Sequence, residues 1–190
     1  MIQAGDPVLR RVAEELTMES IASPGTAELI SELQVSLAEK PGVGIAAPQI
    51  GVSLRVVLVQ DPAAFQAGIP PERLAQLERE PVEQYVLINP ELETIGTETR
   101  TFFEGCLSVD GYRALVRRAH RVRVRYLDID GNRHEEIVTG WHARILQHEV
   151  DHLNGTLYVD RMFTRSFMSD EHYEYWAHES PDVVARVFEV

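Results

Sequence analysis

Several features that define protein classes are scarce in this sequence. Its 190 residues include a single cysteine, which excludes a disulfide within the chain. The longest apolar runs are far shorter than the ~20 residues that cross a bilayer, and no charged-then-apolar signal segment opens the chain. The 18 Lys and Arg are outnumbered by 30 Asp and Glu, and the resulting net charge of −12 argues against nucleic-acid binding over the whole surface. We therefore expect a soluble, intracellular protein with no membrane partner.

The chain is long enough and apolar enough to form one domain without cross-links. With 44% hydrophobic residues, a chain of this length can remove roughly 70% of its unfolded surface from water. Apolar residues spaced by three and four predict a short helix over Pro7–Leu16 and a second helix over Leu29–Leu37. We expect Thr26 to be the N-cap of the second helix and Pro41-Gly42 to end it.

Strands dominate the middle of the sequence, and one strong helix follows them. A Pro- and Gln-rich surface excursion follows Val59 and extends to Gln84. It contains a short predicted helix over Pro71–Leu77, and nothing in it suggests chemistry. A helical period then runs from Trp141 to Asn154-Gly155. This order favours an α+β fold. The segments with β-branched and aromatic content that we predict to be strands are Leu54–Val59, Tyr85–Ile88, Glu91–Phe103 and the hairpin pair Arg121–Tyr126 and Glu135–Thr139.

The strongest chemical motif is H-E-x-x-H on that last helix. His148 and His152 are four residues apart, so both imidazoles can reach one metal ion from the same face. Glu149 projects to the same side without being forced to bind, and it is therefore available to move protons on a bound water. The motif predicts a catalytic metal centre, which needs a third protein ligand.

Two positions, Glu171 and Cys106, compete for the third ligand. Tyr158 occupies the place where one group of metalloproteases has a third histidine. Glu171 lies at the distance used by another group, but its segment is polar and weakly patterned. Cys106 lies at the edge of a strand-rich segment, and a thiolate is a strong donor for zinc or iron. We favour Cys106.

Three segments together resemble the signature motifs of the peptide deformylase family, in the family's order. They are Gly42–Gln49 (GVGIAAPQ), Glu104–Ser108 (EGCLS) and Gln147–His152 (QHEVDH). The resemblance covers roughly residues 1–165, and three linked motifs are far more specific than one. It implies antiparallel strands packed around the central helix that carries H-E-x-x-H, and a single catalytic domain over residues 1–165.

The resemblance also implies a reaction and the residues that perform it. The enzyme would remove the formyl group from the N-terminal formylmethionine of new polypeptides and release formate, with a metal-bound water attacking the formyl carbon. Glu149 would be the general acid/base, and Gln49 with the backbone N–H of Leu107 would stabilise the oxyanion. The metal ligands would be Cys106, His148 and His152.

The substrate would be an N-formylmethionyl peptide, and the cofactor one divalent ion. Gly44 would pair with the peptide through its backbone, while the methionine pocket would be bordered or supported by Val43, Glu104, Arg113 and Ile145. The family commonly uses Fe²⁺. Zn²⁺, Ni²⁺ or Co²⁺ would be able to replace it during purification.

Departures from many bacterial members point to a branch of the family. Asp110-Gly111-Tyr112 and Gly140–Arg144 look more like the plant and mitochondrial branch and its bacterial relatives. The implied location is the bacterial cytoplasm, or an organelle if the chain is the mature form of a eukaryotic protein. The tail over residues 166–190 is acidic, which argues against the basic ribosome-docking helix of many bacterial members. We expect this tail to pack on the body or to form a dimer contact, in a monomer or a homodimer.

An arginine-rich stretch offers a different route to the ribosome. Five arginines lie between Arg117 and Arg125 without an intervening acid. They could contact ribosomal RNA from one face of the hairpin, but a solvated strand face paired with nearby carboxylates is the reading that we favour.

Two other functions stay open at this point. A zinc endopeptidase would require Glu171 as a ligand, and a formyl-peptide binding protein would have lost catalysis. Nothing in the sequence supports such a loss, because Glu149, Gln49 and the three proposed ligands are all present.

Overall fold

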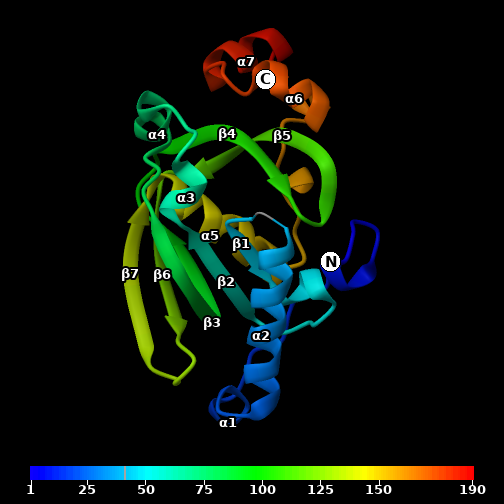
Figure 1. Cartoon of the computed structure of the whole chain (residues 1–190), viewed down its shortest axis with the longest axis vertical. Helices are drawn as coiled ribbons and strands as arrows, with labels where there is room; N and C mark the ends of the chain where they lie inside the picture. Colours follow the sequence, from blue (N-terminus) through cyan, green and yellow to red (C-terminus); the bar gives the residue numbers. More distant parts are fainter. Residues whose placement is uncertain (41) are drawn as a thin grey trace.

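The computed structural model describes residues 1–40 and 42–190, and its framework is two antiparallel sheets with one helix between them (Figure 1). The larger sheet has the strand order β1-β2-β3-β6-β7, and the smaller has the order β4-β5-β8. The strands of the two sheets are β1 (Gly44–Ala46), β2 (Val56–Asp61), β3 (Val82–Thr94), β4 (Thr99–Cys106), β5 (Val109–Ala119), β6 (Arg121–Leu127), β7 (Arg133–Thr139) and β8 (Met168–Ser169).

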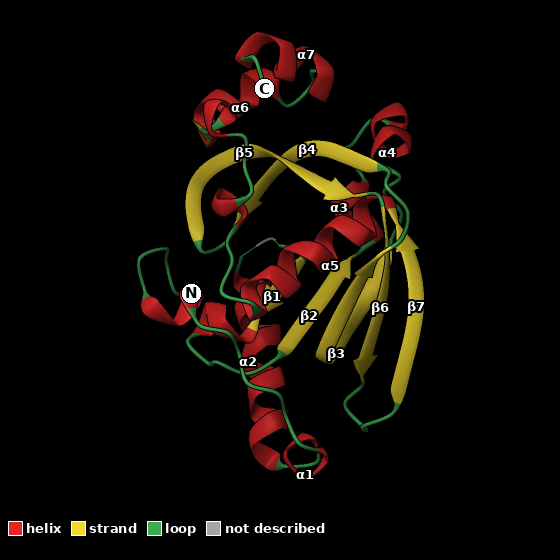
Figure 2. Ribbon diagram, turned by 180° about the vertical axis from the view of Figure 1, so that it is seen from behind, coloured by secondary structure: helices red, strands yellow, loops and turns green. Residues whose placement is uncertain are grey.

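Helix α5 (Gly140–Leu153) runs between the large sheet and the arch formed by β4 and β5 (Figure 2). Helix α2 (Pro24–Glu39) packs on the other face of the large sheet. Strand β2 shows why both helices are needed: Val57 and Val59 pack in the cluster that contains α5, while Val56 and Leu58 pack in the cluster that contains α2. All four side chains are fully buried, as the sequence predicted for this strand.

The remaining helices lie at the edges of this framework. Helices α3 (Ala63–Gln66) and α4 (Pro71–Leu77) belong to the excursion between β2 and β3. Helices α6 (Asp170–Trp176) and α7 (Pro181–Phe188) lie beyond the arch at the end opposite α1 (Met18–Ile21) (Figure 1). Across residues 1–40 and 42–190, none of the helices combines the length and apolar content needed to cross a bilayer.

Two predictions near the start of the chain were wrong. Over Pro7–Leu16 there is only a 3₁₀ turn at Pro7–Arg10, because the backbone N–H of Ala13 donates to the carbonyl of Leu153 at 2.8 Å instead of continuing a helix. Helix α2 starts at Pro24, and its N-cap is Ser23. The Thr26 hydroxyl instead donates to the Ser20 carbonyl at 2.7 Å. Half of the predicted Pro41-Gly42 stop, Pro41, lies outside the described residues.

The strands in the middle of the chain also differ from prediction. The continuous strand expected over Glu91–Phe103 is divided between β3 and β4 by a turn in which Gly96 takes a positive φ of 76°. Strand β5 was not predicted. Short helix α4, hairpin β6–β7 and helix α5 lie where the sequence placed them.

The acidic tail contacts the small sheet. The ring of Tyr173 lies 5.1 Å from that of Phe103 on β4, and Val184 on α7 is fully buried. In contrast, Tyr175 is 74% exposed. The tail therefore has its own small apolar cluster against the outer face of the arch.

Candidate metal centre

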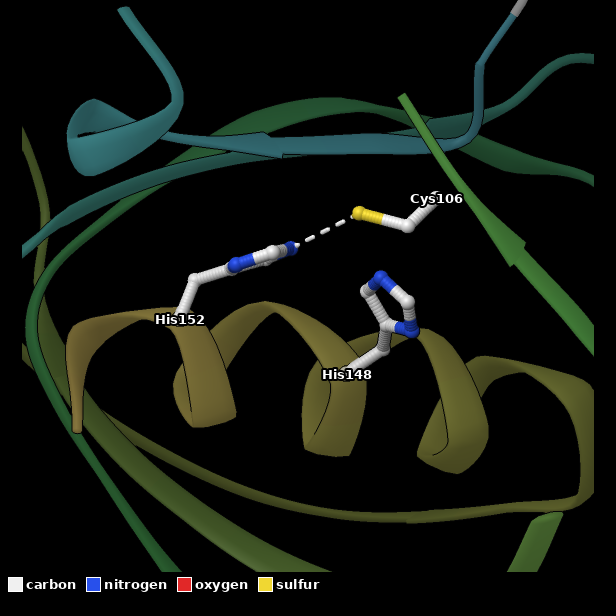
Figure 3. A group of neighbouring side chains, drawn as sticks. All are labelled: Cys106, His148 and His152. Carbon is white, nitrogen blue, oxygen red and sulfur yellow. Dashed lines mark hydrogen bonds between the residues drawn. The ribbon is translucent and has the colours of Figure 1, made fainter. Parts of the chain in front are cut away.

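The three proposed metal ligands meet between helix α5 and the end of strand β4 (Figure 3). His148 and His152 project from successive turns of α5 toward Cys106, and the three ligand atoms all lie within 4.8 Å of one another. The Cys106 Sγ to His152 Nε2 distance is 3.2 Å. Glu171 is exposed on α6 and does not belong to this group, so the endopeptidase interpretation lacks its ligand.

The chemistry of this group fits a divalent transition metal. One sulfur and two imidazoles are ligands that zinc and iron both accept. The Nδ1 of His148 donates to Glu104 Oε2 at 2.9 Å, which leaves the Nε2 lone pair available for a metal. Among the described residues, His152 Nδ1 and Glu149 Oε2 are buried and have no hydrogen-bond partner. The interior around the proposed ligands therefore contains polar atoms whose hydrogen-bonding capacity is not met by protein groups.

Glu104 links His148 to a set of buried charges that we call the buried cluster: Glu104, Arg118, Arg144 and Asp151. Arg118 donates to both carboxylate oxygens of Glu104 at 2.9 Å and also bonds to Asp151. Each of the four side chains is less than 10% exposed. Burial opposes ionisation of Glu104, but the hydrogen bonds from His148 and Arg118 outweigh it and lower the pKa of this carboxyl.

Glu149 lies against the backbone of strand β1. It is 4% exposed, and desolvation by burial raises its pKa to about 7. A Cβ placed on Gly44 would come within 2.7 Å of Glu149 Cδ, so only glycine fits at this point of the strand. The small residue that the sequence singled out is therefore explained by the position of the acid/base candidate.

The Gln49 amide is held in one orientation. Its Oε1 accepts from the backbone N–H of Ala46 at 2.8 Å, and this bond turns the amide nitrogen toward the metal ligands. Nε2 lies 3.6 Å from Cys106 Sγ and 3.3 Å from Ser108 Oγ. Gln49 is 1% exposed. Leu107 lies in the tight turn between β4 and β5, and it lines one pocket together with Gln49.

A pocket of about 460 Å³ connects these residues. The substrate-site residues predicted from the sequence, Val43, Gly44, Glu104, Arg113 and Ile145, all line it, as do Gln49, Leu107, Cys106, His148 and Glu149. Sequence reasoning assigned no site role to several other lining residues, among them Arg79, Tyr112, Trp141 and Arg144.

The signals for these missed residues differ. Trp141 lies on the same helical stripe as Ile145 and His148, so the period of α5 was enough to find it. Arg79 belongs to the excursion in which the sequence suggested no chemistry. Arg79 lines the pocket only because the tertiary fold brings that segment to it, which the local sequence does not reveal.

The arginine-rich stretch is not one exposed face. Arg118 is 5% exposed and belongs to the buried cluster. Arg123 and Arg125 pair with Glu93 and Glu135 across neighbouring strands, with Arg123 Nη1 to Glu93 Oε2 at 2.8 Å and Arg125 Nε to Glu135 Oε2 at 2.6 Å. We call these four residues the surface ladder. The favoured interpretation, a strand face paired with carboxylates, fits the ladder but not Arg118.

Comparisons with known proteins agree with this architecture. A family model described as polypeptide deformylase matches residues 1–167. The chain is 43% identical over 171 residues to the chloroplastic peptide deformylase 1A of Solanum lycopersicum, covering 90% of this chain and 62% of that relative's length. It is 44% identical over 187 residues to peptide deformylase 3 of Streptomyces avermitilis, covering 97% of this chain and 81% of the relative.

Solved structures give the same result. A Met-Ala-Ser-bound class I type b peptide deformylase from Acinetobacter baumannii superposes with a TM-score of 0.74 at 35% identity, covering 85% of this chain and 96% of the other. An inhibitor complex of the Plasmodium falciparum peptide deformylase gives 0.69 at 31% identity, covering 85% and 88%. The predicted α+β fold class is confirmed, and the relatives include the plant organellar and bacterial forms that the sequence indicated. By sequence, fold and relatives, this chain belongs to the peptide deformylase family.

Proposed function

We propose that the chain hydrolyses the N-terminal formamide of formylmethionyl polypeptides and releases formate. The observation that carries the proposal is the convergence of the Cys106/His148/His152 group, the buried Glu149 and the oriented Gln49 amide in one pocket. The Acinetobacter relative holds Met-Ala-Ser, a tripeptide that begins with methionine. This supports a methionyl peptide as the ligand of the same fold here.

Cys106, His148 and His152 would hold one divalent ion, for which we propose Fe²⁺ in the cell and Zn²⁺, Ni²⁺ or Co²⁺ as alternatives. Such an ion, when bound, lowers the pKa of a coordinated water to about 7 and polarises a carbonyl oxygen. Glu104 fixes the imidazole of His148 through its Nδ1 and increases the basicity of that ligand.

The Glu149 carboxylate would accept a proton from the attacking water and pass it to the departing amine nitrogen. A pKa of about 7 suits both steps, because a group with that pKa gains and loses a proton readily near neutrality. Burial beside Gly44 also keeps Glu149 close to the strand on which we place the substrate backbone.

Gln49 and the Leu107 backbone N–H would stabilise the negative charge that develops on the formyl oxygen. The bond from Ala46 holds the Gln49 NH₂ in place before substrate arrives, so little reorganisation is needed in the transition state. One such donor is typically worth about 3 kcal/mol.

The peptide would lie along β1, which is an edge strand of the large sheet. An exposed strand edge can accept an extended peptide as an additional strand. The first side chain would then enter the pocket beside Val43, Arg113 and Ile145.

The test is formate release from formyl-Met-Ala-Ser under anaerobic conditions with iron or nickel supplied. We expect Glu149→Gln to keep the metal and to lower turnover by at least ~10²-fold, and Cys106→Ala to lose the metal. Glu171→Gln is the matched control and should change neither. Absence of formate release by the metal-loaded wild type, or cleavage of internal peptide bonds instead, would overturn the proposal.

The organisation of the chain is a further part of the proposal. Residues 1–165 would form the catalytic domain, and residues 166–190 would pack on it. The extent of the family match and the Tyr173 contact with Phe103 support this division. A chain truncated after Arg165 should retain metal binding and formate release but unfold at a lower urea concentration. Loss of the metal by the folded truncated chain would contradict the division.

A further inference from the structure

The excursion between β2 and β3 sends one charged side chain into the pocket. Arg79 lines the pocket with Trp141, Arg144 and Ile145. Its side chain is 12% exposed, which is unusual for an arginine outside a buried charge cluster. None of the catalytic steps described above uses it.

Arg79 is fixed by two interactions at once. Its Nε and Nη2 donate to the two carboxylate oxygens of Asp61 at 2.7 and 2.8 Å, and Asp61 is fully buried at the end of β2. The guanidinium carbon also lies 5.3 Å from the centre of the Trp141 ring. A planar guanidinium held by a bidentate carboxylate and an aromatic face has little rotational freedom. Arg79 is therefore a rigid part of the pocket wall.

The excursion itself is docked on the start of helix α5. Gly140 takes a positive φ of 59°, and a Cβ there would come within 2.8 Å of the Glu78 carbonyl oxygen. The Glu78 carboxylate lies 2.9 Å from His120 Nε2. These contacts place Arg79, the next residue in the chain, beside the first turn of α5.

Helix geometry gives the separation along α5 between the metal centre and the residue that Arg79 contacts. Trp141, Ile145 and His148 lie on one face of α5, and the seven steps from Trp141 to His148 span about 10 Å along the helix axis at 1.5 Å per residue. The metal centre lies at His148, whereas Arg79 lies on Trp141. The space between them suits a long, unbranched side chain.

We infer that Arg79 is a specificity-determining residue: with Trp141 it forms the far wall of the pocket that receives the first side chain of the substrate, and it limits the size of that side chain. The inference rests on the proposed function, because it assigns the pocket to a formylated N-terminal residue. It adds that the limit is set by the excursion between β2 and β3 and by the buried Asp61 that holds Arg79, rather than by the three motifs.

The test compares two substrates in a variant that removes the whole ion pair. Arg79→Leu alone would leave the Asp61 carboxylate buried without its partner, so it is combined with Asp61→Asn. We expect the ratio of kcat/KM for formyl-Phe-Ala-Ser to that for formyl-Met-Ala-Ser to rise about 10-fold or more, because pocket-size changes of this order discriminate by that factor. The matched control removes an exposed ion pair, by Arg165→Leu with Glu189→Gln, and should leave the ratio unchanged.

The outcomes separate the two proposals. If the metal-loaded wild type releases no formate from formyl-Met-Ala-Ser, the proposed function fails. If the wild type is active and the folded double variant keeps the wild-type ratio, only the role of Arg79 is overturned. Should the double variant not fold, Arg79→Lys decides, because it keeps Asp61 paired but replaces the broad guanidinium with a compact ammonium. A raised ratio supports the inference, and an unchanged ratio overturns it.

Discussion

The buried cluster and the surface ladder are built from the same residue types but differ in their surroundings. In the buried cluster, Arg118 and its acidic partners are less than 10% exposed. In the surface ladder, the side chains of Arg123, Arg125 and their glutamate partners are 29% to 54% exposed. Water screens the ladder, whereas the cluster has only its own members to balance each charge.

This difference explains why only one of the two sets bears on the metal centre. Glu104 is shared between Arg118, Arg144 and the Nδ1 of His148, so the cluster orients a proposed metal ligand. The ladder joins β3, β6 and β7 and touches none of the proposed ligands. Whether an ion pair bears on the metal centre therefore depends on its burial and its neighbours, and the number of ion pairs in a region does not indicate this.

The largest expected effect comes from removing the centre of the buried cluster. Arg118→Met should lower the free energy of unfolding by about 3–5 kcal/mol, because Glu104 and Asp151 would each lose a buried partner. Urea unfolding measures this loss. Arg125→Met in the surface ladder is the matched control, and equal losses in the two variants would contradict the distinction.

A second substitution tests the connection between the cluster and the metal. Glu104→Gln keeps an oxygen that can accept from His148 but removes its charge, so metal affinity should fall by about 10- to 100-fold. Competition with a chelator measures the affinity, and Glu93→Gln is the control. An unchanged metal affinity in Glu104→Gln would show that the cluster serves stability alone.

The sequence predicted the centre of this site much better than its surroundings. The two proposed ligands on α5 follow from a four-residue spacing on a strongly patterned helix, and the other motifs pointed to Cys106, Gln49 and Gly44, which the structure places around the same pocket. Each of these predictions rests on a local sequence pattern, which can be recognised without knowing the fold. The hairpin and short helix α4 were predictable for the same reason.

Long-range contacts account for what the sequence did not reveal. Strand β5 was missed because its buried positions do not alternate: Ala114, Leu115 and Val116 are buried in succession between two apolar clusters, and the charged Arg118 is buried as well. The helix expected over Pro7–Leu16 fails because Leu153, far along the chain, takes the backbone donor of Ala13. Arg79 reaches the pocket only because its excursion docks on Gly140.

An intermediate effect is expected at the edge of the buried cluster. Arg161 donates to both oxygens of Asp151 at 2.6 and 2.7 Å, but its side chain is 49% exposed. Arg161→Gln should therefore lower the free energy of unfolding by about 1–2 kcal/mol, since Asp151 keeps Arg118. If Arg161→Gln lowered the free energy of unfolding as much as Arg118→Met, the strength of these ion pairs would not depend on their burial.

The smallest effect belongs to the surface ladder itself. The hydrogen bond from Arg123 lowers the pKa of Glu93 below the ordinary glutamate value of 4.5. A carboxyl with a lowered pKa in the folded state contributes stability above the unfolded pKa and loses it as the pH falls through the folded one. Glu93→Gln should therefore lower the urea midpoint slightly at neutral pH and low salt, and the difference from wild type should vanish in acid or at high salt. If the difference instead persisted in acid and high salt, the contribution of Glu93 would come from packing, and the ladder would resemble the buried cluster more than its exposure indicates.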